Sequence, residues 1–486
     1  MNKPIRAVAG FSLVLFLALL LNVTYLQFWR PGALNEAPRN RRVINAAFSR
    51  ERGAILAGKD TVARSIKSDS KYEFQRRYPQ ALKYAHVTGY FSFYSQTGVE
   101  LSQNALLSGD DSRFFVTRLI DMLSNTEPKG GNVELTIDPA AQNAAYEGLR
   151  ALGEGVKGAV VALEPSTGRV LAMVSNPTYD PNRLASHDLE AVNEASAELN
   201  ADPAAPLLNR SIGTRLPPGS TFKLVTAAAA LETGNYTADS MVPGGYTYQL
   251  PQSSTSIGNH DGGNCGGDRI TLTRALQVSC NVTFLSLADD LGNDKMAEQA
   301  EKFGFNDVSL TDLAGQAVSQ YPRDMDRPQT AMSGIGQSSV TATPLQMAMV
   351  AAGIANDGDV MTPYVVDQVL APNLDTLEKT EPQRLSNAIS AGTAQELTTM
   401  MVSTVDSGTG TPAAIPGVRV AGKAGTAQSA PDRPPYAWFV SFAPADDPKV
   451  AIAVMIESSE AARDEIAGGL MGGPISRAVM EAVGIR

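Results

Sequence analysis

Histidine, cysteine and tryptophan are scarce in this chain, whose 486 residues include three His, two Cys and two Trp. No group of His, Cys and carboxylates with metal-ligand spacing occurs along the sequence, which argues against a metal centre. Walker and dinucleotide-binding glycine motifs are also absent, so we expect no nucleotide cofactor. The formal net charge of −10 argues against a nucleic-acid partner.

Only one apolar run is long enough to span a bilayer, which needs roughly 20 residues. This run lies between residues 7 and 29, after Lys3 and Arg6. Basic residues on that side favour a cytoplasmic N-terminus. Because no small-x-small cleavage site precedes a polar start, we favour an uncleaved anchor over a signal peptide. We therefore expect an anchor at 1–30, a linker at 31–42, and the remainder outside the cytoplasmic membrane.

The two cysteines, Cys265 and Cys280, would then lie in an oxidising compartment. An even count in an exported protein favours a disulfide over two free thiols. A cysteine nucleophile is disfavoured, because none of the three histidines is placed near Cys280 by the sequence.

Ser220 and Lys223 form a Ser-x-x-Lys motif that follows a Pro-Pro-Gly breaker and opens an apolar, alanine-rich segment. This pattern places Ser220 at or beside a helix N-terminus. Lys223 shares a helix face with it, since residues three apart are neighbours on a helix. A serine hydroxyl becomes a good nucleophile when an adjacent amine removes its proton.

Two further motifs follow in order. Ser279 and Asn281 lie at the junction of two helical segments, and Lys423 and Gly425 follow a β-like stretch. Singly, each motif fits a plain structural role, such as a helix cap or a solvated lysine. The order Ser-x-x-Lys, Ser-x-Asn, Lys-x-Gly is typical of serine-acylating penicillin-binding proteins and β-lactamases.

The distribution of elements predicts an α+β fold. A hairpin at 159–174 and two strands at 437–442 and 449–456 enclose helices at 220–232, 270–291, 344–355 and 391–405, with a terminal helix at 473–483. Strands at both ends with helices between predict an antiparallel sheet with helices on both faces. We place this domain at 158–486, after a small α+β module at 43–157 that includes a strand at 132–138 and a helix at 139–152. The polar segment 234–268 is expected to be a loop over the site.

The chain resembles the class B penicillin-binding proteins, most closely the actinobacterial penicillin-binding protein A group. Besides the three motifs, the resemblance rests on Arg52-Gly-Ala-Ile-Leu-Ala, Arg77-Tyr-Pro, His86-Val-Thr-Gly-Tyr, residues 158–179, Gly336-Gln and Thr343-Pro-Leu-Gln-Met-Ala. The region before the catalytic domain is too short for a glycosyltransferase, which argues against the bifunctional class A enzymes.

The resemblance implies a membrane-anchored D,D-transpeptidase that cross-links peptidoglycan stem peptides during cell division and is acylated by β-lactams. It makes Ser220 the nucleophile, Lys223 its base and Ser279 the proton relay. Asn281 would hold Lys223 and the substrate amide. The remaining implied substrate-binding residues are Lys423, Gly425 and Thr426, with the backbone N–H groups of Ser220 and Thr426 as oxyanion hole.

Ala424 departs from the family pattern, in which Thr or Ser usually follows that lysine. The missing hydroxyl puts β-lactam affinity in question more than the reaction class. Two alternatives to the transpeptidase remain open. One is a hydrolase on the same scaffold, either a D,D-carboxypeptidase or a β-lactamase; the other is a division scaffold with impaired catalysis, whose 43–157 module binds division proteins.

Overall fold

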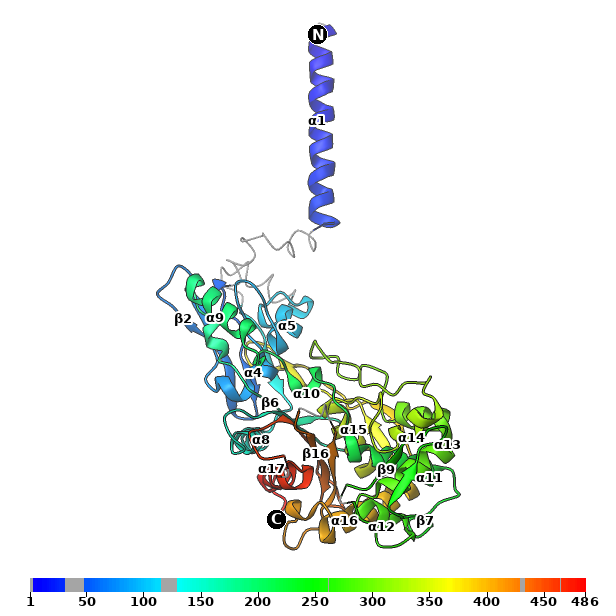
Figure 1. Ribbon diagram of the computed structural model, residues 1–486. Helices are drawn as coiled ribbons and strands as arrows, with labels where there is room; N and C mark the ends of the chain where they lie inside the picture. The colour runs from blue at the N-terminus through cyan, green and yellow to red at the C-terminus, as the bar shows by residue number, and fades with distance from the viewer. Residues whose placement is uncertain (1–2, 31–47, 115–128, 261, 429–432, 464) are drawn as a thin grey trace.

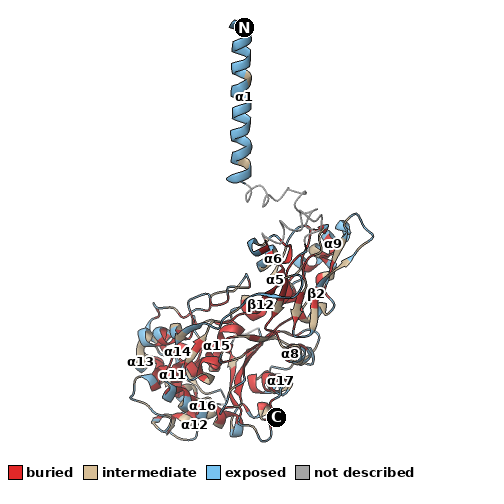
Figure 2. Cartoon of the chain, turned by 180° about the vertical axis from the view of Figure 1, so that it is seen from behind, coloured by how far each residue is buried: buried red, intermediate tan, exposed pale blue. Residues whose placement is uncertain are grey.

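The computed structural model describes residues 3–30, 48–114, 129–260, 262–428, 433–463 and 465–486. Helix α1 (Lys3–Phe28) is the only helix among these residues that is long and apolar enough to cross a membrane. None of its residues is buried, as Figure 2 shows along its length. The expected linker at 31–42 lies outside the described residues, as do 43–47 and 115–128 of the expected N-terminal module.

The N-terminal module is built on a six-stranded sheet in the order β13-β12-β4-β1-β2-β3. Its early elements are β1 (Ile55–Ala57), β2 (Asp60–Lys67), β3 (Phe74–Arg77), α4 (Ala81–Thr88), α5 (Gly98–Ser102), α6 (Asn104–Leu107) and β4 (Asn132–Leu135). At its centre Glu100 is fully buried and pairs with Arg52 and Arg76, each at 2.6 Å. The two arginines hold the pKa of Glu100 below its usual range even though burial opposes them.

Two strands of this sheet come from far along the chain. Strand β12 (Val366–Leu370) pairs antiparallel with β4, and β13 (Thr376–Lys379) pairs with β12. The early module and the region after residue 158 therefore share one sheet, and Figure 2 shows β12 in the same part of the molecule as β2 and α5. His86 joins the two regions as well, since its ring lies 2.8 Å from the Pro206 carbonyl oxygen and is buried. His86 is therefore a buried structural residue.

The catalytic region is built on a five-stranded antiparallel sheet in the order β15-β16-β17-β5-β6. The strands are β5 (Lys157–Leu163), β6 (Val170–Asn176), β15 (Ala421–Ala427), β16 (Tyr436–Ala443) and β17 (Val450–Ser458). Nearly all of their residues are buried, because helices cover both faces. Helices α8 (Pro139–Arg150) and α17 (Gly468–Ala482) pack on one face, and α15 (Pro344–Ala355) packs on the other.

The remaining elements lie outside the five-stranded sheet, and α9 (Leu189–Ala201) among them lies beside the N-terminal module (Figure 1). The others are α10 (Arg210–Gly213), α11 (Lys223–Glu232), α12 (Leu272–Gln277), α13 (Asn281–Lys302), α14 (Arg327–Ser333), α16 (Ala391–Ser407), and the short strands β7 (Met241–Pro243), β8 (Thr247–Gln249), β9 (Ser256–Gly258), β10 (Arg269–Thr271), β11 (Asp359–Met361) and β14 (Arg384–Asn387). Strands β7, β8 and β9 lie within the segment 234–268, which was expected to be a loop. Helices α11 and α15 are buried over nearly their whole length (Figure 2).

The terminal helix begins five residues earlier than its expected start at 473. Its first turns contain Gly468, Gly469, Gly472 and Gly473, which local propensity disfavours in a helix. Packing explains the difference, since a Cβ on Gly472 would lie 2.5 Å from the Phe439 Cβ on the sheet. Only glycine allows this helix to lie so close to β16.

Candidate active site

Ser220 lies on a 3-10 turn, Gly219–Phe222, which runs directly into α11. The preceding Pro218 and the left-handed Gly219, with φ of 54°, create the sharp entry that an ordinary residue would resist. Ser220 is half-buried and lines a cleft of about 980 Å³. Lys223, on the first turn of α11, is completely buried behind it.

The Nζ atom of Lys223 is surrounded by oxygen atoms of the Ser-x-Asn motif. Its Nζ donates to the Ser279 carbonyl oxygen at 2.7 Å and to Asn281 Oδ1 at 2.8 Å, and lies 3.2 Å from Ser279 Oγ. Burial, followed by the charge of Lys423, lowers the pKa of Lys223 well below its usual value. A neutral amine at neutral pH can accept a proton from a neighbouring serine.

Lys423 approaches the same serine from strand β15. It is completely buried, and its Nζ donates to Ser279 Oγ at 2.9 Å and to the Ala424 carbonyl oxygen at 2.7 Å. Burial lowers the pKa of Lys423 to about 7. The charge of Lys423 depresses the pKa of Lys223, so the pair keeps a proton on Lys423 while Lys223 is free to act as base.

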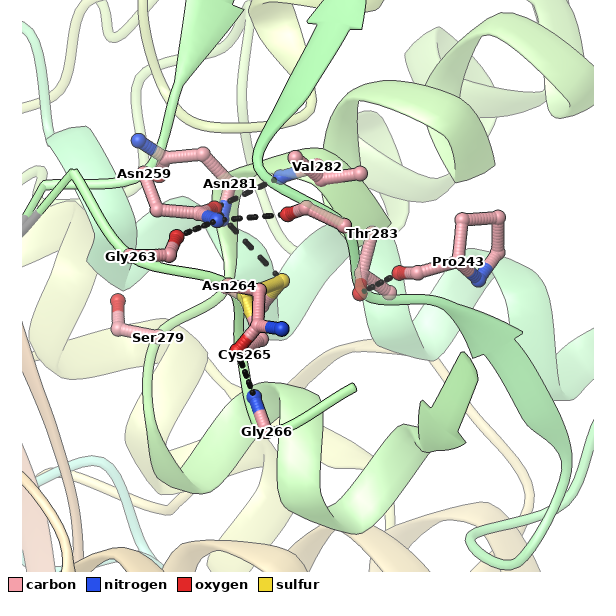
Figure 3. Close-up of a disulfide and its surroundings, with 12 residues drawn as sticks. Pro243, Asn259, Gly263, Asn264, Cys265, Gly266, Ser279, Asn281, Val282 and Thr283 are labelled. Atoms are coloured by element: carbon pink, nitrogen blue, oxygen red, sulfur yellow. Dashed lines mark hydrogen bonds between the residues drawn. A yellow bond between two sulfur atoms is a disulfide. The ribbon is translucent and has the colours of Figure 1, made fainter. Parts of the chain in front are cut away.

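Ser279 connects α12 to α13 in a left-handed conformation, with φ of 61°. Non-glycine residues adopt this region rarely and at a cost of roughly 1–3 kcal/mol, so the surrounding contacts must hold it. One such contact is a disulfide between Cys280, the next residue, and Cys265, whose Cα atoms are 5.7 Å apart. Figure 3 shows how this bond joins the start of α13 to the loop that carries Asn259 and Gly266.

Asn259 is a site residue that the sequence did not reveal. Its Oδ1 accepts from the backbone N–H of Asn281 at 2.9 Å and of Val282 at 3.3 Å, while Cys280 provides no side-chain cap. Its Nδ2 donates to the carbonyl oxygens of Gly245 and Gly263. Asn259 therefore caps α13 from a distant loop (Figure 3). The only signal for this role in the sequence was that Asn259 lies shortly before Cys265, the expected disulfide partner of Cys280 in the Ser-x-Asn motif.

Strand β15 passes very close to the turn that carries Ser220. A Cβ on Gly425 would lie 3.0 Å from the Thr221 backbone nitrogen and 3.1 Å from the Pro218 carbonyl oxygen. Glycine at this position therefore lets the strand approach the nucleophile. Because β15 is an edge strand, its outer backbone groups are available to pair with an extended peptide.

Ala424 and Thr426 lie on the same face of β15, two residues apart, and both line the cleft. Ala424 is 8% exposed, so it adds little to the cleft surface. The Thr426 hydroxyl is the nearest substitute along the strand for the one that Ala424 lacks.

The structure thus gathers all of the expected site residues at one place. Ser220, Ser279, Asn281, Gly425 and Thr426 line the cleft, with Lys223 and Lys423 hydrogen-bonded behind them. Across the described part of the chain, no group of three or more His, Cys, Asp or Glu side chains could hold a metal ion.

Comparison with known proteins agrees with this geometry. The penicillin binding protein transpeptidase domain family matches residues 158–481. The chain belongs to the penicillin-binding protein transpeptidases. A second family, the penicillin binding protein A dimerisation domain, matches residues 52–133 of this transpeptidase.

Close relatives of this family member span its whole length. The peptidoglycan D,D-transpeptidase PbpA of Mycolicibacterium smegmatis is 42% identical, with 99% of each chain covered. The protein of the same name from Mycobacterium tuberculosis is 40% identical, also with 99% of each covered. The penicillin G acyl-enzyme complex of M. tuberculosis penicillin-binding protein A is 41% identical, with a TM-score of 0.84 over 90% of this chain and 100% of that one. The class B assignment and the α+β fold are thereby confirmed.

Proposed function

We propose that the protein is a peptidoglycan D,D-transpeptidase that works through an acyl-enzyme on Ser220. The observation that carries this proposal is the convergence of two buried lysines on Ser279, within one cleft that Ser220 lines. The relatives named peptidoglycan D,D-transpeptidase over the full length support the reaction class.

In the acylation step, Ser220 Oγ attacks the carbonyl carbon of the penultimate D-Ala of a stem peptide. Lys223 takes the hydroxyl proton as the new C–O bond forms. The backbone N–H groups of Ser220 and Thr426 receive the developing oxyanion; removing one such donor typically costs about 3–4 kcal/mol in the transition state. The C–N bond then breaks, and a proton relayed through Ser279 leaves with the amine of the last D-Ala.

In the second step, an amine of a neighbouring stem peptide attacks the ester carbonyl and loses its proton to the site. The C–O bond to Ser220 breaks, Ser220 recovers a proton, and a cross-linking amide is left. A β-lactam follows the first step only: its ring amide opens on Ser220, and the leaving amine stays attached to the acyl group.

The α1 helix supports membrane anchoring, and we propose that the N-terminus is cytoplasmic and the catalytic region extracellular. Basic residues flank the apolar run on both sides, Lys3 and Arg6 before it and Arg39, Arg41 and Arg42 after it. The orientation therefore rests on the disulfide, which suits an exported domain, and on a substrate that lies outside the cell. An impermeant protease should digest the catalytic region in intact spheroplasts; full protection would contradict this orientation.

We propose the domain plan as an anchor at 1–30, a linker at 31–42, a non-catalytic module at 43–157 and the transpeptidase domain at 158–486. Of the described module residues, none lines the cleft, which leaves their outer surface for division proteins. The shared sheet makes the module and the transpeptidase domain one structural unit rather than two independent ones.

Product analysis tests the reaction class. The ectodomain is given a D-alanyl thioester donor and a D-amino acid acceptor, and amide and free acid products are separated. We expect an amide product in the native protein and none in Ser220→Ala. Free acid as the only product would indicate a carboxypeptidase. Hydrolysis of added penicillin would indicate a β-lactamase. Normal septation in cells that carry only a Ser220→Ala allele would indicate a division scaffold.

A further inference from the structure

The cleft has an unusual charge pattern for so acidic a chain. The whole chain has a net charge of −10, yet no Asp or Glu is among the described residues that line the cleft. Its two basic lining residues are His260 and Arg274. Arg274 carries a guanidinium group, which is a cation in proteins. The cleft therefore offers a permanent cation to an incoming ligand, in addition to the buried lysines.

Arg274 lies on α12, five residues before Ser279, and its side chain is held by neutral groups. Its Nη1 donates to Gln277 Oε1 at 2.6 Å, and Gln277 Nε2 donates to Ser407 Oγ at 2.7 Å. In the described part of the chain, Arg274 forms no ion pair with a carboxylate. The guanidinium is thus oriented without being neutralised, and it retains free N–H donors.

The loop that the disulfide holds borders the cleft beside Arg274. A Cβ on Gly266 would lie 3.6 Å from Arg274 Nε, and Gly266, Cys265 and Arg274 all line the cleft. Thr409 and Ala424 line the same cleft, Ala424 from strand β15. A ligand that enters the cleft therefore meets both the guanidinium on α12 and the Lys-Ala-Gly strand.

We propose that Arg274 is a specificity-determining residue that binds a carboxylate of the peptidoglycan substrate. The proposal rests on the transpeptidase function proposed above. Guanidinium groups bind carboxylates through paired N–H donors in a planar fork, which suits this role. Because Ala424 has no hydroxyl, the terminal carboxylate has fewer partners on β15, and Arg274 supplies donors from α12.

Two substrate carboxylates share this chemistry: the C-terminal carboxylate of the leaving D-Ala, and a side-chain carboxylate further along the stem. Three donors separate them. The first is an acyl-D-alanyl thioester whose leaving group carries a carboxylate, the second has a carboxamide in its place, and the third adds a γ-linked D-Glu to the carboxamide donor.

The experiment measures acylation of Ser220 by each donor in the native ectodomain, Arg274→Gln and Arg274→Lys. Arg269→Gln is the matched control, because Arg269 is a nearby exposed arginine that does not line the cleft. We expect Arg274→Gln to weaken carboxylate-bearing donors roughly 5- to 10-fold, as befits a partly solvated charged hydrogen bond. The loss should be in the apparent binding constant rather than the acylation rate constant, should shrink at high salt, and should be partly recovered in Arg274→Lys.

Loss with the first donor assigns the terminal carboxylate, and loss with only the third assigns the stem carboxylate. An equal loss with the neutral donor would show that Arg274 only supports α12, and would overturn the proposal, as would an unchanged Arg274→Gln. Failure of the native protein to acylate with any donor would instead refute the proposed function.

Discussion

At the residue scale, Ser279 links the two lysines whose charges control the chemistry of the site. Its hydroxyl lies 2.9 Å from Lys423 Nζ and 3.2 Å from Lys223 Nζ, so it connects a lysine that should be neutral with one that should be charged. Both lysine side chains are fully buried, and burial lowers the pKa of each. The pair therefore makes activity sensitive to pH near neutrality.

The pKa of about 7 for Lys423 predicts how acylation depends on pH. A lysine is charged below its pKa, so the attraction for a substrate carboxylate should be lost as pH rises through about 7. The second-order rate constant, which reports the free protein, should then fall above neutrality for penicillin and for a thioester with a carboxylate leaving group. A carboxamide donor should lack this fall. A penicillin rate that stays flat or rises up to pH 9 would contradict a charged Lys423.

At the element scale, the turn between α12 and α13 depends on contacts from outside both helices. The sequence predicted two helices joined at the Ser-x-Asn motif, because their apolar periodicity is local. It could not predict the left-handed Ser279 or the cap from Asn259, since both depend on a loop brought close only by folding. The true start of α17 could not be predicted either, because its first turns are rich in glycine and packing against β16 outweighs helix propensity there.

Asn259→Ala should therefore harm the site more than its position in a loop suggests. Loss of a helix cap typically costs about 0.5–2 kcal/mol, and this cap also fixes Asn281, which holds Lys223. We expect a lower unfolding temperature and a slower acylation rate constant. Asn264→Ala is the control, since Asn264 lies in the same loop and its side chain accepts a bond from Gly266 N–H rather than capping α13. Equal behaviour of the two variants would rule out the capping role.

At the scale of the whole molecule, the chain folds as an interleaved structure. The sequence indicated a boundary at 158, and the transpeptidase family matches from there. Yet α8 contributes Ala141, Ala145 and Leu149 to the core beneath the catalytic sheet, and β12 returns to pair with β4. Strand pairing across more than two hundred residues leaves no local pattern, so it could not be predicted from periodicity.

This interleaving predicts that a fragment of residues 158–486 will be less stable than one of residues 129–486, which keeps β4 and α8. Loss of the buried Leu149 side chain alone should lower the free energy of unfolding by about 1.5–3 kcal/mol. We expect the shorter fragment to unfold at lower temperature and to be digested faster by a protease. Identical melting and digestion of the two fragments would show that α8 contributes nothing to the catalytic core.

The most direct test of the account is intact-mass spectrometry of the ectodomain after incubation with penicillin G, with peptide mapping of the adduct. We predict a stable mass increase equal to one penicillin, located on the peptide that contains Ser220, and no increase in Ser220→Ala. An adduct on another residue, or the same adduct in Ser220→Ala, would contradict the assignment of Ser220 as the nucleophile.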